Sequence, residues 1–124
     1  MPDTSKQDKN TARVYRMAFG TVYPLYIKKV ERKGRTKGEV DVIITWLTGY
    51  DDKAIDDRVR DGTDFESFFR RAPCFNENSS KITGMICGYR VEEIEDEIIR
   101  KVRCLDKLID ELAKGKAMDK ILRK

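Results

Sequence analysis

Residues 90–114 read RVEEIEDEIIRKVRCLDKLIDELAK, and this stretch decides the fold of the chain. Its apolar side chains recur every three or four residues, at Val91, Ile94, Ile98, Val102, Leu105, Ile109 and Leu112. That spacing predicts one long amphipathic helix with an apolar stripe about 80° wide. Ile99 and Leu108 lie on the two shoulders of the stripe. We therefore expect this helix to be covered from several sides.

The rest of the chain has the length and composition of a single domain. It has 124 residues, of which 40% are apolar, enough for one hydrophobic core. Residues 1–10 are polar and aperiodic, which predicts a disordered N-terminal tail. Residues 11–124 are expected to form one compact all-α domain of five to six helices around the long C-terminal helix at about 90–114.

The first helical segment, from residue 11 to about 30, contains a proline. Pro24 lacks an amide donor, so the segment is expected to kink or split within residues 20–24. An aromatic row runs along one face at spacings of four, four and three residues, through Tyr15, Phe19, Tyr23 and Tyr26. Such a row is first a core or interface face, and a base-stacking platform is the alternative.

Two capping boxes divide the middle of the chain. Thr36 with Glu39 predicts a helix that starts near Lys37 and ends at Gly49 in the left-handed conformation. A third helix is expected over residues 52–60. Thr63 with Glu66 then predicts a short helix whose core anchors are Phe65, Phe68 and Phe69.

Residues 82–88 are short and apolar enough for a strand. However, Gly88 and Tyr89 repeat the earlier pair Gly49 and Tyr50 at an offset of 39 residues, which favours a helix, a Gly-Tyr turn and a second helix used twice. Strand and helix both stay open for this segment, and we favour the helix.

Histidine is absent from the sequence. Its absence removes Ser-His-Asp and Cys-His catalysis and imidazole metal sites. We predict no catalytic residue, no metal site and no cofactor, so an enzyme is the third choice of function. The three cysteines form no C-x-x-C pair, and Cys74 and Cys87 are expected to be buried. Cys104 lies off the apolar stripe near Arg100 and Arg103, which leaves a reactive thiol as an alternative.

No stretch of about 18 apolar residues could span a bilayer, and the first twelve residues contain no apolar signal region. The sequence therefore predicts a cytoplasmic protein without a membrane partner.

Several stretches resemble one bacterial family. They are YPLY at 23–26, GRTK at 34–37, WLTGYD at 46–51, ITGMICG at 82–88 and LDKLIDELAKGKA at 105–117. On these runs the chain resembles the domain of unknown function family numbered 2200, over about residues 11–124. The resemblance implies a small bacterial protein made of that one domain. It implies no activity and no site residue.

Basic side chains are most concentrated around residues 28–37. This segment contains one carboxylate, Glu31, and six cations: Lys28, Lys29, Arg32, Lys33, Arg35 and Lys37. Cations at a helix C-terminus complement the helix dipole, which is the structural interpretation. The functional alternative is a site for nucleic-acid or other ligand phosphates, which the C-terminal cations or Arg13 and Arg16 could widen.

The leading prediction of function is a small non-catalytic protein that binds a partner or self-associates. Apolar surface beyond the stripe predicts a homodimer, with Tyr23, Ile99 and Leu108 as its contacts. Nucleic-acid or phosphate binding through residues 28–37 is the second prediction. A helix-turn-helix reader is disfavoured because the helices after both Gly-Tyr pairs begin with carboxylates.

Overall fold

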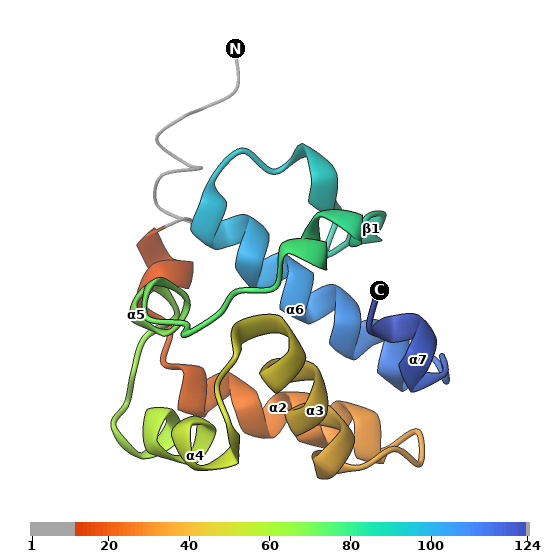
Figure 1. The fold of residues 1–124 in the computed structure, drawn as a ribbon, viewed down its shortest axis with the longest axis horizontal. Coiled ribbons are helices and arrows are strands. Elements are labelled where there is room, and N and C mark those ends of the chain that lie inside the picture. The colour runs from red at the N-terminus through yellow and green to blue at the C-terminus, as the bar shows by residue number, and fades with distance from the viewer. Residues whose placement is uncertain (1–11, 124) are drawn as a thin grey trace.

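The computed structural model describes residues 12–123, so the predicted tail at 1–10 lies outside the described residues. The chain is mostly helical, as predicted (Figure 1). After a helical turn at residues 12–16, the α-helices are α2 (Phe19–Glu31), α3 (Lys37–Thr48), α4 (Asp52–Arg60), α5 (Phe65–Arg70), α6 (Glu97–Ala113) and α7 (Met118–Ile121). Two short strands, β1 (Met85–Ile86) and β2 (Tyr89–Arg90), form a hairpin.

Helix α6 is the centre of the fold, because α2, α3, α5, α7 and the hairpin all pack against it. It begins at Glu97, so the prediction of a helix over 90–114 was wrong at its start. The Asp96 carboxylate accepts the Ile99 amide at 2.9 Å and caps the helix there. Residues Val91–Glu93 form a 3₁₀ helix, which still buries Val91. The apolar residue Val91 therefore still packs into the core, although no continuous helix joins residue 91 to α6.

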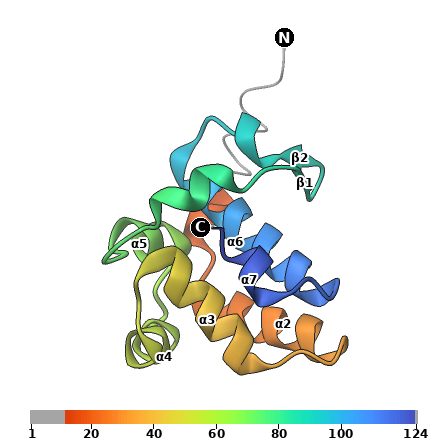
Figure 2. The same cartoon turned by 45° about the vertical axis from the view of Figure 1, so that its right-hand side comes forward.

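Helices α2 and α6 lie side by side and run in the same direction (Figures 1 and 2). Two polar contacts follow the seam between them, Tyr26 with Asp106 and Lys29 with Asp110, and Tyr15 in the preceding helical turn contacts the α6 cap Asp96; each pair is 80 or 81 positions apart. The constant offset is what two parallel helices of the same rise per residue require. Consequently the C-terminal ends of α2 and α6 lie at the same end of the molecule.

The break in the first segment lies earlier than predicted. Helix α2 continues through Pro24, and the chain instead leaves the helical path at residues 17–18. There the Phe19 amide donates to the Thr63 carbonyl at 2.8 Å, and the Phe65 amide donates to the Met17 carbonyl at 2.9 Å. These long-range backbone bonds replace the helical ones, so the start of α5, and not the proline, sets the position of the break.

The predicted caps are confirmed at α3 and wrong at α5. Thr36 and Glu39 form the capping box, and Gly49 ends α3 with a φ of 83°. At α5 the cap is Asp64, which accepts the Ser67 amide at 2.8 Å. The Thr63 carbonyl is already bonded to Phe19, and Asp64, one residue later, is a better N-cap than Thr.

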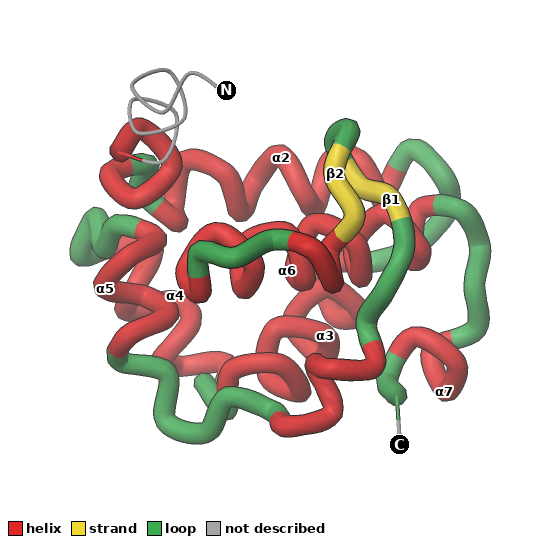
Figure 3. Tube along the Cα trace, turned by 90° about the horizontal axis from the view of Figure 1, so that it is seen from above, coloured by secondary structure: helices red, strands yellow, loops and turns green. Residues whose placement is uncertain are grey.

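The segment at 82–88 is not a helix, which contradicts the favoured prediction. Strands β1 and β2 pair antiparallel, with Ile86 opposite Tyr89, on the α6 side of the fold (Figure 3). The two residues between them, Cys87 and Gly88, have φ values of 51° and 83°. Positive φ at both central positions is typical of the tight type I′ hairpin turn. Gly88 and Tyr89 therefore do not repeat the cap at Gly49.

The aromatic row faces the core, as first predicted. Phe19 stacks on Phe68 with a centroid separation of 4.1 Å, and Phe68 stacks on Tyr50 at 4.8 Å. The Tyr50 hydroxyl donates to the Phe68 carbonyl at 2.7 Å, so its polar end is also satisfied. This cluster joins α2 to α5 and to the turn after α3.

The cysteines are arranged opposite to expectation. Cys74 and Cys87 are exposed, whereas Cys104 is buried. Burial raises the pKa of the Cys104 thiol to about 11, so the structure contradicts a reactive Cys104. Over residues 12–123, no helix is long and apolar enough to cross a membrane.

Candidate anion-binding surface

The six predicted cations divide into two groups. Lys28, Arg32 and Lys33 are exposed, and no ion pair within residues 12–123 joins them to a carboxylate. The other three, Lys29, Arg35 and Lys37, have carboxylate partners. The sequence pattern could not make this division, because all three partners, Asp110, Glu39 and Asp41, lie outside residues 28–37.

Arg35 connects the start of α3 to the end of α6. Its guanidinium donates to Glu39 at 2.7 and 3.1 Å, and to the Lys116 carbonyl at 2.9 Å. Hydrogen bonds from Arg35 lower the pKa of Glu39. Its donors are committed to the fold, so we remove Arg35 from the candidate site.

Lys37 belongs to a cluster with Tyr23 and Asp41. Its ammonium donates to Asp41 at 2.8 Å, and the Tyr23 hydroxyl donates to the other oxygen of the same carboxylate. Burial, followed by the bond to Asp41, raises the pKa of Tyr23 to about 12. The Lys37 charge is thus largely neutralised by Asp41, although its side chain is half-exposed.

Parallel packing brings the cations of α6 to the same end of the molecule. Lys114 lies 2.9 Å from Asp110, and Lys29 reaches that carboxylate at 3.3 Å from α2. The two lysines share one negative charge. We define the basic end as Lys28, Lys29, Arg32, Lys33 and Lys114.

The C-terminal cations Lys116 and Arg123, predicted to widen the basic end, are paired with a carboxylate. Lys116 and Arg123 both contact Glu111, and Arg123 binds it through two nitrogens at 2.6 and 2.8 Å. This pairing holds the segment after α7 against α6. Lys124 lies outside the described residues.

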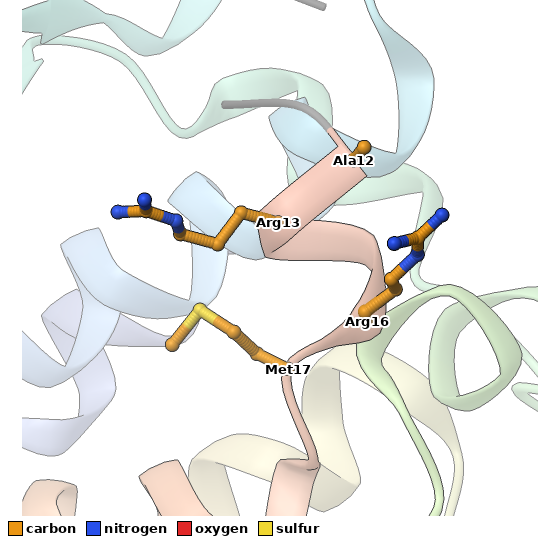
Figure 4. Close-up of a pocket in the computed structure, with 4 residues that line it drawn as sticks. All are labelled: Ala12, Arg13, Arg16 and Met17. Carbon is orange, nitrogen blue, oxygen red and sulfur yellow. The ribbon is translucent and has the colours of Figure 1, made fainter. Parts of the chain in front are cut away.

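Arg13 and Arg16 belong to a different place. They contribute to an open pocket with Ala12 and Met17, next to the start of α2 and away from the basic end. Figure 4 shows the two guanidinium groups pointing apart. They therefore do not converge on a common ligand position.

The predicted self-association contacts are mostly internal. Leu108 is 0% exposed and Tyr23 is 5% exposed, so both are core residues of one chain, and their prediction as surface contacts was wrong. The elements around α6 cover both shoulders of its apolar stripe, and Ile99 keeps only partial exposure.

No cluster of three or more Asp, Glu or Cys side chains suited to holding a metal ion occurs within the described part of the chain. Two carboxylates of the α4 region make local contacts: Asp51 caps the helix by accepting the Ala54 amide at 2.8 Å. Asp57 pairs with Arg60.

Comparison with known proteins identifies the family. The model of the family described as an uncharacterized protein conserved in bacteria, DUF2200, matches residues 13–123. The chain belongs to the DUF2200 family. A solved structure similar to it is the crystal structure of uncharacterized protein SP1917, at 42% sequence identity and a TM-score of 0.84. That similarity covers 89% of this chain and 90% of the other.

No curated protein matches this DUF2200 chain. The family description and the similar structure carry no activity that could be transferred to it. Function must therefore be argued from the basic end itself.

Proposed function

We propose that the chain is a non-catalytic binding protein whose basic end contacts the phosphates of a nucleic acid. The observation that supports this most is the group of exposed cations Lys28, Arg32 and Lys33, which have no carboxylate partner among residues 12–123. Phosphate chains are bound by several cations within reach of one another. Lys29 and Lys114, which share Asp110, extend the same surface.

The helix dipole alone is a weaker explanation for these cations. Backbone amides already serve the last carbonyls of α2: Lys33 and Arg35 donate to Val30, and Gly34 donates to Glu31. Lys28 and Arg32 are one turn apart, and like charges at that spacing repel. An anionic ligand would remove this repulsion, whereas solvent only screens it.

The test is a titration of labelled oligonucleotides with the full chain at two salt concentrations. If three cations contact phosphates, a rise from 50 to 200 mM salt should weaken binding roughly 20- to 40-fold. Changing Lys28, Arg32 and Lys33 together to Glu should abolish binding at unchanged helicity. These residues project from the surface, so the fold should tolerate the change.

The matched control changes Lys53, Arg71 and Arg100 to Glu. These are also exposed cations without a carboxylate partner in the described chain, and the change in net charge is the same. The control should retain most of the binding. If both triple variants weaken binding equally, or if the unchanged protein binds no nucleic acid at low salt, the proposal is wrong.

We retain the homodimer as a second proposal, now without Tyr23 and Leu108. The supporting observation is that Leu25 and Met85 are exposed large apolar side chains. Light scattering at micromolar concentrations decides it: a mass near 14.4 kDa rejects the dimer, and twice that mass supports it.

We also infer a cytoplasmic location. The exposed free thiols of Cys74 and Cys87 suit a reducing compartment. Thiol labelling of protein taken directly from cells should modify both cysteines, and a disulfide there would contradict the inference.

A further inference from the structure

The hairpin presents an aromatic ring beside the seam of α2 and α6. Tyr89 on β2 is 52% exposed, and the Arg103 guanidinium lies 5.8 Å from its ring centroid. Arg103 donates to Asp106 at 2.8 Å, and the same carboxylate accepts the Tyr26 hydroxyl at 2.6 Å. A line of contacts thus runs along α6 from the hairpin to α2.

The same line leads to the basic end. Asp110 follows Asp106 by one turn of α6 and binds both Lys29 and Lys114. From Arg103, beside the ring, to Lys114 the helix rises about 16 Å. The aromatic ring and the basic end are therefore separated by about three turns of one helix, with Lys107 as a further cation along it and Arg103 paired with Asp106.

Several contacts fix the position of Tyr89. The tight turn at Cys87 and Gly88 joins its strand to β1. The Lys107 ammonium donates to the Met85 carbonyl at 3.2 Å, which ties β1 to α6. A ring held in place loses little freedom when a ligand covers it.

We propose that Tyr89 is a base-stacking platform and that the nucleic acid bound by the basic end is single-stranded. This inference rests on the proposed function. Unpaired bases can stack on an exposed aromatic ring while their phosphates contact neighbouring cations. The bases of a duplex are already stacked on one another, so a duplex can use the cations but not the ring.

The experiment compares a single-stranded oligonucleotide with the duplex of the same sequence. Tyr89→Ala should weaken binding of the single strand roughly 5- to 150-fold, the range for loss of one base–aromatic stack. Binding of the duplex should change less than twofold. Tyr89→Phe keeps the ring and should bind the single strand as the unchanged protein does.

The control is Met85→Ala on the neighbouring strand. Met85 is exposed to the same extent as Tyr89 but carries no ring, so its loss should leave binding within about twofold. Equal thermal midpoints of the Ala and Phe variants at Tyr89 would show that the hairpin is intact. If the midpoints differ, the binding of Tyr89→Phe should instead be compared with that of Tyr89→Leu, which keeps an apolar side chain but no ring.

The two proposals fail in different ways. If Tyr89→Ala binds the single strand normally while the triple Glu variant does not, the stacking inference is wrong and the proposed function stands. Equal weakening of single strand and duplex by Tyr89→Ala also overturns the inference. If the unchanged protein binds neither nucleic acid, both proposals are wrong.

Discussion

Replacing Tyr26 with Phe would remove one hydroxyl from the seam of α2 and α6 and leave the ring in place. Tyr26 is buried, and its hydroxyl donates to Asp106 at 2.6 Å across 80 residues of sequence. A hydrogen bond to a charged group contributes about 1.5–3 kcal/mol. Since no cavity forms, we expect the free energy of unfolding to fall by about 2 kcal/mol.

The expected shift in thermal midpoint follows from chain length. Unfolding entropies near 60 °C are about 2.1 cal/mol/K per residue, or roughly 0.26 kcal/mol/K for a chain of this size. A loss of about 2 kcal/mol therefore lowers the midpoint by about 8 °C. Denaturant unfolding followed by circular dichroism gives the free energy directly.

A double-mutant cycle with Asp106→Asn separates the contact from other effects. If the hydroxyl and the carboxylate interact, the two changes should be coupled by about 1 kcal/mol or more. Additive effects, or a loss below about 0.5 kcal/mol for Tyr26→Phe, would refute the parallel register of α2 and α6.

Three further predictions concern single positions. Leu108→Glu should abolish cooperative unfolding in circular dichroism because it buries an unpaired charge, whereas Val42→Glu at a 47% exposed position should keep a midpoint within a few degrees. Burial alone would raise the pKa of Glu111, but the bonds from Arg123 lower it overall. This pair therefore stabilises the fold at pH values above the ordinary pKa of Glu, and the stabilisation is lost as the pH falls through the lowered pKa. Glu111→Gln should therefore flatten the acid side of the stability profile, and an unchanged profile would contradict the assignment. Cys87→Asn should raise the free energy of unfolding by up to about 1 kcal/mol because Asn accepts the left-handed conformation better, and a decrease would argue against the hairpin turn.

The local features of the fold were predictable because local chemistry determines them. Thr36, Glu39 and Gly49 satisfy the orphan backbone groups of α3, and the partners lie within a few residues. The core anchors of α5 were likewise identified from their own spacing. In these cases tertiary contacts add to the local preference and do not compete with it.

The errors occurred where a local pattern was compatible with two structures. Apolar spacing at 91–98 fits a helix, yet the same side chains can be buried from a 3₁₀ helix once Asp96 caps α6. At the hairpin, the usual Asn-Gly signal is absent because Cys87 occupies the first turn position. The sequence therefore contains no turn signal that would favour a strand here.

The surface predictions depended on contacts that no local pattern contains. A helical wheel places both Leu108 and Ile99 at the edges of the apolar stripe, but the elements packed around α6 bury Leu108 completely. In the sequence, Tyr89 stands out only as part of a Gly-Tyr pair. Its nearness to Arg103 depends on the hairpin, which the sequence did not predict.

The basic end illustrates why charge density in the sequence overstates a binding surface. Of the six cations at 28–37, Lys29 and Arg35 interact with groups near residue 110 and beyond, more than 70 positions away. Reversing the charge of Arg35 would break its bonds to Glu39 and to the end of α6, so lost binding in that variant would report damage to the fold. Lys28, Arg32 and Lys33 have no such contacts within residues 12–123. Their reversal changes the surface potential and little else, which is why the binding test uses these three.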